Sequence, residues 1–104
     1  MRSGWPSDVI SGLKSRVRYI ANNNNFYEFY IGRTTNLIAS QSRHGCDKII
    51  PLYKTSTANH AIQVEGALIR TFRNHRKCSN DAPHSGGGVA DGYTNYVYVA
   101  VWYF

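Results

Sequence analysis

The sequence predicts an α+β domain in which a three-stranded antiparallel sheet is flanked by helices. One observation is the C-terminal run from Tyr96 to Phe104, which is almost entirely β-branched or aromatic. Such a run is typical of a central strand buried on both faces. The other observation is the segment from Thr57 to about residue 76, where apolar residues recur at helical spacing. These residues are Ile62, Leu68, Ile69 and Phe72.

Two β-rich runs in the first third of the chain predict the remaining strands. Val17 to Ile20 and Phe26 to Ile31 flank four consecutive asparagines at residues 22–25. Asparagine tolerates the left-handed backbone conformation that turns require. We therefore expect a hairpin with a loop of about five residues, to which the C-terminal strand adds as the third.

A second, shorter helix is predicted over residues 34–44. Thr35 or Asn36 would cap its start, and Gly45 would end it. We expect a linker through Pro51 between this helix and the longer one. The predicted order of elements is therefore β-β-α-α-β.

Length and composition indicate a single domain spanning residues 1–104. With 104 residues and 42% hydrophobic content, the chain is long and apolar enough for one core. It has no apolar run of the ~18 residues that a membrane span requires, and its N-terminus does not resemble a signal peptide. We expect an intracellular protein, in the cytoplasm, nucleoid or nucleus, with Cys46 and Cys78 as reduced thiols and no structural zinc.

The charge balance favours a polyanionic partner. Twelve Lys and Arg against six Asp and Glu give a formal net charge of +6, and eight of the twelve are arginine. Arginine suits bidentate contact with phosphate, so nucleic acid is the first candidate. A protein that is basic without binding nucleic acid is the alternative. The sequence gives no indication of the oligomeric state.

Glu65 is a carboxylate in an apolar setting. It lies three residues after Ile62 and four before Ile69, on the apolar face of the predicted helix. A buried carboxylate is costly unless it is paired or bound to a metal. Considered alone, the helix favours an ion pair with an arginine, and a ligand for a hard divalent ion is the alternative.

Two tripeptides around the predicted hairpin resemble the motif of the GIY-YIG nuclease family. Val17-Arg18-Tyr19 keeps only the tyrosine of the first tripeptide, whereas Tyr30-Ile31-Gly32 matches the second in full. The run that follows, Arg33-Thr34-Thr35-Asn36-Leu37, also resembles the family, which has a basic residue, a threonine and an Asn-Leu pair here.

The resemblance extends over residues 17 to 80. The family often has a histidine at the position of His44, a glutamate on a later helix at that of Glu65, and an asparagine at that of Asn80. It has an arginine at the position of Ser40, eight residues after Gly32. Ser40 is the main departure from the pattern.

The resemblance implies phosphodiester hydrolysis. Tyr19 would be the general base, and Tyr30 would orient the water or a phosphate oxygen. Glu65 would hold one Mg²⁺ or Mn²⁺ that stabilises the leaving oxygen. Asn80 would support the site, and His44 would contact a phosphate or assist the tyrosine. The residues expected to contact nucleic acid are Arg18, Arg33, Arg43 and Lys77.

The sequence thus predicts a Mg²⁺-dependent endonuclease acting on DNA, with RNA as the other polymer that the charge allows. The alternative is a catalytically inactive nucleic-acid-binding module of the same fold, and a third reading is an unrelated basic α+β domain. Loss of one phosphate-binding contact at position 40 costs ~10²- to 10³-fold in rate.

Ser40 has three explanations. Arg43 or Arg33 replaces the family arginine, or the chain is a weakened nuclease that mainly binds, or the serine is an engineered replacement. From sequence, we expect Ser40→Arg to raise cleavage.

Overall fold

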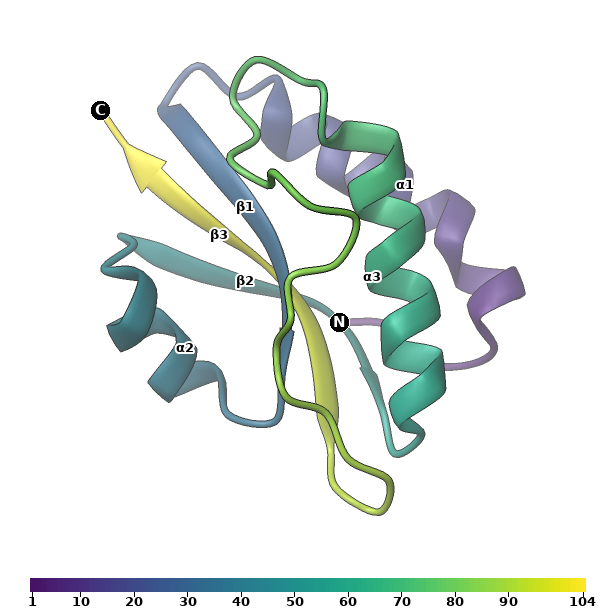
Figure 1. Ribbon diagram of the computed structural model, residues 1–104. Coiled ribbons are helices and arrows are strands. Elements are labelled where there is room, and N and C mark those ends of the chain that lie inside the picture. The colour runs from purple at the N-terminus through teal and green to yellow at the C-terminus, as the bar shows by residue number, and fades with distance from the viewer.

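The computed structural model of residues 1–104 has three helices and three strands in alternation (Figure 1). They are α1 (Pro6–Ala21), β1 (Phe26–Thr34), α2 (Leu37–His44), β2 (Lys48–Thr55), α3 (Ala58–Phe72) and β3 (Asn95–Tyr103). The strands form one antiparallel sheet in the order β1-β3-β2. The predicted α+β class and three-stranded antiparallel sheet are confirmed, and β3 is the central strand.

The predicted N-terminal hairpin is wrong, because residues 17–20 belong to α1 rather than to a strand. The buried positions of α1 include Val9, Leu13, Val17 and Ile20, which recur every three or four residues along one helical face. Pro6 stands in the first turn, where a helix tolerates proline. Helical spacing over the whole segment therefore outweighs the local β-propensity of Val17 to Ile20.

The strand β2, which takes the place of the predicted N-terminal strand in the sheet, lies where a linker was predicted. Pro51 favours a linker on sequence grounds, but edge strands accept proline because one side of their backbone has no strand partner. The N-terminal segment covers part of this edge. The backbone N–H of Arg2 donates to the Leu52 carbonyl, and the N–H of Lys54 donates to the Arg2 carbonyl, both at 2.9 Å.

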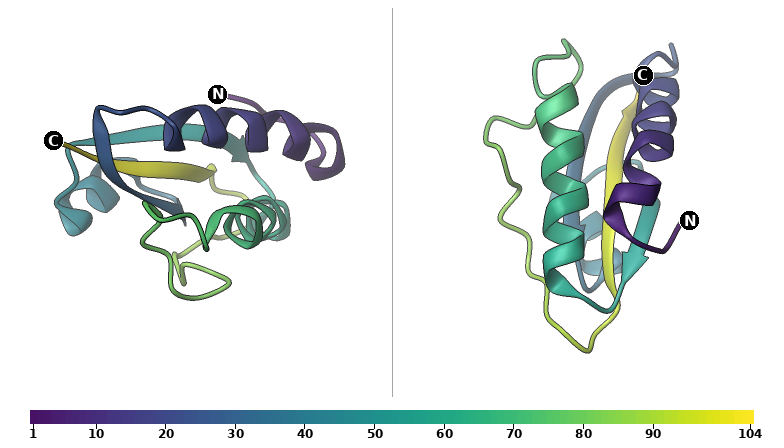
Figure 2. Two further views of the ribbon diagram at one scale, coloured as in Figure 1. Left: turned by 90° about the horizontal axis from the view of Figure 1, so that it is seen from above. Right: turned by 90° about the vertical axis from the view of Figure 1, so that its right-hand side faces the viewer.

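The two faces of the sheet carry different packing. Val97, Val99 and Val101 of β3 pack into the main core with α1 and α3, which also pack directly against each other (Figure 2). Alternate residues, Tyr98 and Ala100, belong to a smaller cluster beside α2. Figure 1 shows α2 on the other side of the sheet from α1 and α3. This alternation decides which side chains can meet at a site.

The connection between α3 and β3 runs along the free edge of β1 (Figure 1). Asn80 acts there as a backbone substitute: its Oδ1 accepts from the Ile31 N–H and its Nδ2 donates to the Ile31 carbonyl, both at 2.8 Å. Further along, Arg33 Nε donates to the Gly87 carbonyl at 2.9 Å. The connection therefore satisfies the exposed edge of β1 and holds residues 30–33 in place.

Two further findings concern the cysteines and the helices. Cys46 and Cys78 are both free thiols. None of the three helices is long and apolar enough to cross a bilayer.

Candidate active site

A cluster of aromatic and titratable side chains lies between α2 and the sheet. The Tyr98 hydroxyl and His44 Nε2 are 2.9 Å apart, within hydrogen-bond distance. The Tyr30 ring lies beside the same imidazole, with a separation of 4.8 Å between ring centroids. The Trp102 ring is nearly perpendicular to the same imidazole, with 6.4 Å between ring centroids. His44, at the C-terminal end of α2, is thus held by three aromatic residues of the sheet.

Strand register brings Tyr98 to this place. Tyr98 of β3 is the cross-strand partner of Gly32 of β1. A Cβ atom at position 32 would collide with the Tyr98 phenol, so the glycine makes room for the ring. The intact Tyr30-Ile31-Gly32 tripeptide therefore supplies one tyrosine directly and the space for a second.

The protonation of the cluster follows from burial. Burial, and secondarily the charge of Glu65, raises the pKa of Tyr30. Burial also raises the pKa of Tyr98, while Ser40 and Arg43 act in the opposite direction. Burial and then Arg43 lower the pKa of His44. At neutral pH both phenols therefore keep their protons, and the imidazole is neutral and able to accept one.

Ser40 faces the sheet from the middle of α2. It is the buried residue of this helix, with no exposed surface, and its Oγ has no hydrogen-bond partner within normal distance. Position 40 is therefore enclosed rather than open to a phosphate. Arg43 is exposed one turn later and is near enough to affect the pKa of Tyr98. Arg43 is therefore a cation beside the position where the resemblance expects an arginine.

Glu65 of α3 forms a second cluster at the edge of β1. Its Oε1 lies 2.9 Å from Arg33 Nη1, and the carboxylate has no exposed surface. Ser85 donates to the same carboxylate twice, through its backbone N–H to Oε1 and through its hydroxyl to Oε2. His84 Nδ1 is 3.6 Å from Oε1. The ion pair that the helix pattern favours is therefore present.

Within this cluster, Oε2 is the Glu65 oxygen that would have a lone pair to offer a divalent ion, although the carboxylate is buried and already paired with Arg33. A carboxylate has about four lone-pair sites, and Oε2 accepts only from the Ser85 hydroxyl. Mg²⁺ often keeps several waters and one or two carboxylate ligands. No cluster of three or more His, Cys, Asp or Glu side chains adds further ligands. Access to Oε2 requires the Ser85 hydroxyl to leave it.

Three predicted site residues lie away from both clusters. Tyr19, predicted on a strand beside Tyr30, is 73% exposed on α1, which packs on the opposite face of the sheet from His44. Arg18 is on the same helix, with its guanidinium 5.8 Å from the centre of the Phe72 ring. Lys77 is buried, and its Nζ donates to the Asn23 carbonyl at 3.0 Å. This placement gives no support to the prediction that Lys77 contacts nucleic acid.

The remaining predicted residues are brought together. Tyr30, His44, Ser40 and Arg43 surround Tyr98, and Arg33 contacts Glu65. Asn80 uses both of its polar atoms on the backbone of Ile31, so it positions the strand that carries Tyr30.

Sequence reasoning missed Tyr98 and Ser85. Tyr98 carries a usable signal, because alternation along a strand pairing antiparallel with residues 26–34 places it opposite Gly32. Ser85 carries none, since nothing local shows that its loop returns to α3.

Comparison with protein-family models, curated proteins and solved structures found no match.

Proposed function

We propose that the chain hydrolyses phosphodiester bonds in nucleic acid, with the Tyr98–His44 pair as its acid–base group. The observation that carries the proposal is the 2.9 Å contact between the Tyr98 hydroxyl and His44 Nε2 beside the Tyr30 ring. A histidine held by a hydrogen-bond partner in this way is suited to take a proton from a reacting water.

The protein residues divide the chemistry as follows. When Nε2–H donates to the Tyr98 oxygen, Nδ1 has a lone pair and no partner in the chain. Nδ1 is then the atom that removes a proton from the attacking water. Tyr98 fixes the tautomer and the ring orientation, and its raised pKa keeps it a neutral partner rather than a phenolate. The general base is thus His44 rather than Tyr19.

Phosphate binding falls to residues at the rim of the site. Tyr30 is half-buried beside His44, and its phenol keeps a proton that it can donate to a phosphate oxygen. Arg43 is exposed at the end of α2 and supplies positive charge near the same point. The formal net charge of +6 supports a polyanionic substrate, and the choice of DNA rests on the family resemblance.

Glu65 is the residue that would hold Mg²⁺ in this proposal. A bound ion would supply positive charge to stabilise the leaving oxygen. Arg33 and Ser85 orient the carboxylate through the contacts described above.

The second candidate is a nucleic-acid-binding module without catalysis. Two observations favour it: Ser40 stands enclosed at the place of the family arginine, and Arg33 already neutralises Glu65. Binding would then depend on exposed cations such as Arg43.

A plasmid-nicking assay with Mg²⁺ or with EDTA tests the proposal, with Glu65→Gln as the metal-ligand variant. We expect Mg²⁺-dependent nicking that EDTA and Glu65→Gln both abolish. Salt-sensitive binding by a folded protein that leaves the plasmid intact would establish the second candidate instead. If the folded wild type neither nicks the plasmid nor binds it, both candidates are overturned.

A further inference from the structure

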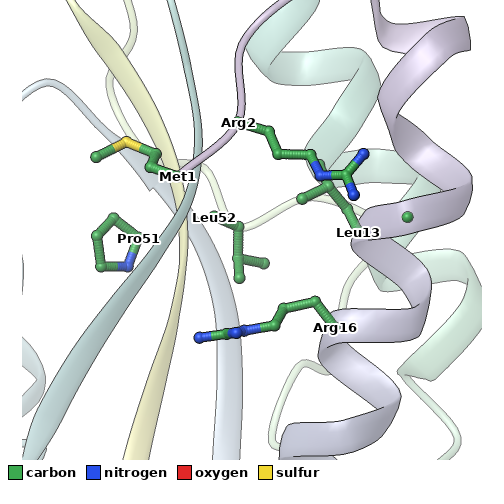
Figure 3. Close-up of a pocket in the computed structure, with 7 residues that line it drawn as sticks. Met1, Arg2, Leu13, Arg16, Pro51 and Leu52 are labelled. Atoms are coloured by element: carbon green, nitrogen blue, oxygen red, sulfur yellow. The ribbon is translucent and has the colours of Figure 1, made fainter.

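A separate cavity of about 340 Å³ lies between α1 and the edge strand β2 (Figure 3). Leu13 and Leu52 contribute apolar surface, and Arg2 and Arg16 carry the charge. Figure 3 shows Arg2 reaching from the N-terminal segment toward α1 and Arg16 reaching from α1 back toward β2. The cavity is at the β2 edge, whereas the Glu65 cluster is at the β1 edge.

Neither guanidinium at this cavity is neutralised. The ion pairs of the chain are those of Arg33 and His84 with Glu65, and neither Arg2 nor Arg16 takes part in one. Asp8 is one helical turn before Gly12 on α1, and it makes no ion pair either. Two arginines therefore border one cavity, whose accessible lining is more polar than apolar, without an acidic partner.

The Arg2 guanidinium lies against α1 at the place where Gly12 has no side chain. A Cβ atom at position 12 would lie 2.8 Å from Arg2 Nη1 and 2.9 Å from Cζ. Glycine inside a helix costs about 1 kcal/mol relative to alanine. The backbone of Arg2 is held to β2 by two hydrogen bonds, and its guanidinium lies close to Gly12 of α1.

We propose that this cavity binds a phosphate monoester carried on a small apolar or aromatic body, such as a nucleoside monophosphate. A phosphate monoester carries about −1.5 to −2 charges at pH 7, which matches two guanidinium groups, whereas a carboxylate matches one. Leu13, Leu52 and Pro51 provide the apolar surface for the rest of the ligand. The proposal does not depend on the nuclease proposal, because no residue is shared.

The test is titration of the full chain with deoxyadenosine 5′-monophosphate, followed by amide NMR shifts and calorimetry. Deoxyadenosine and inorganic phosphate are titrated in parallel to separate the two halves of the ligand. The variants are Arg16→Gln, Gly12→Ala and, as a matched control, Arg18→Gln. Arg18 is on the same helix but over Phe72. Gly12→Ala changes no charge and favours the helix, so weaker binding by this variant cannot come from unfolding.

We expect the nucleotide to shift the amides of Gly12, Leu13 and Leu52, with deoxyadenosine and inorganic phosphate each binding more weakly. Arg16→Gln and Gly12→Ala should weaken binding about tenfold or more, the loss of one charge-assisted contact. Arg18→Gln should keep the affinity for the nucleotide within about twofold of the wild-type value. Equal weakening by Arg18→Gln, or no nucleotide binding by the folded wild type, would overturn the proposal. If inorganic phosphate binds as tightly as the nucleotide, the claim that the cavity also binds the apolar body of the ligand is overturned.

Discussion

Tyr98 stands opposite Gly32 in the β1–β3 ladder, and its phenol ring occupies the space that a side chain at position 32 would fill. The same phenol reaches His44 on α2. One cross-strand pair therefore links the intact tripeptide of β1 to the proposed acid–base group. The tyrosine that shares His44 with Tyr30 comes from the last strand of the chain rather than from the first helix.

We predict that Gly32→Ala lowers the free energy of unfolding by about 1–3 kcal/mol, because the added methyl overpacks the Tyr98 ring. Urea denaturation of the purified variants measures the effect. Gly88→Ala is the matched control, since nothing lies within 4 Å of a Cβ there and its φ is not positive. Equal stabilities for the two variants would show that Tyr98 does not pack on Gly32.

Ser40→Ala should leave the free energy of unfolding unchanged or raise it by up to about 1 kcal/mol. The Ser40 hydroxyl is buried and makes no hydrogen bond of normal geometry, although it is near enough to the Tyr98 phenol to lower the pKa of that group. A buried donor without a full hydrogen bond is destabilising. Thr34→Val is the control, because the Thr34 hydroxyl is buried and bonded to the backbone of Asn36. Thr34→Val should lower the free energy of unfolding by about 1 kcal/mol. A comparable loss in Ser40→Ala would mean that its hydroxyl has a partner in solution.

Ser40→Arg should lower stability rather than restore a phosphate contact. Position 40 has no exposed surface, so a long charged side chain must displace its neighbours or remain buried without a partner. This replaces the expectation from sequence that the variant raises cleavage. Thermal melting and nicking of Ser40→Arg measure both effects, and a more active variant of unchanged stability would contradict the enclosed position.

Arg33→Met should destabilise the domain by about 3–5 kcal/mol, because it leaves the buried Glu65 carboxylate without its cation. Replacing both partners, as Arg33→Met with Glu65→Leu, should recover most of the loss. Chemical denaturation of the single and double variants measures this, with the exposed Arg18→Met as control. A double variant as unstable as the single one would show that the charge of Glu65 is not the cause.

Stability should fall as the pH drops below about 6.5, the ordinary pKa of histidine. Burial lowers the pKa of His44 and His75 in the folded chain, so between the folded and unfolded pKa values the unfolded chain binds more protons. The two histidines contribute fully to the free energy of unfolding above pH 6.5. This contribution is lost as the pH falls through their pKa values in the folded chain. Melting temperatures from pH 8 to pH 5 measure this effect. The His44→Gln/His75→Gln double variant should show a shallower decline, and an unchanged decline would assign the effect to other groups.

The sequence is sufficient for the parts of the fold that local patterns determine. The central strand, α3 and α2 follow from β-propensity, helical periodicity and the Asn36 and Gly45 caps, all of which the structure confirms. The ion pair of Glu65 follows from its place on an apolar face, although its partner Arg33 is set by tertiary packing.

The errors come from segments in which tertiary structure outweighs local preference. Val17 to Ile20 is β-branched and aromatic, yet its apolar residues continue a helical face that begins at Val9. Pro51 suggests a break, yet an edge strand accommodates it. The resemblance was placed on Val17-Arg18-Tyr19, which lies on α1 and away from Tyr30, so Tyr19 was expected at a place that it does not occupy. Only the β1–β3 register shows that Tyr98 is the one beside His44.

The most direct test of the central claim compares Tyr98→Phe with Tyr19→Phe in Mg²⁺-dependent plasmid nicking. Both substitutions remove one hydroxyl and keep the ring, but only Tyr98→Phe removes a contact with His44. The Tyr98–His44 account predicts that Tyr98→Phe lowers the nicking rate at least about tenfold, as part of the 10²- to 10⁴-fold that acid–base groups contribute, and that Tyr19→Phe retains it. Loss of nicking in Tyr19→Phe with a fully active Tyr98→Phe would contradict the account.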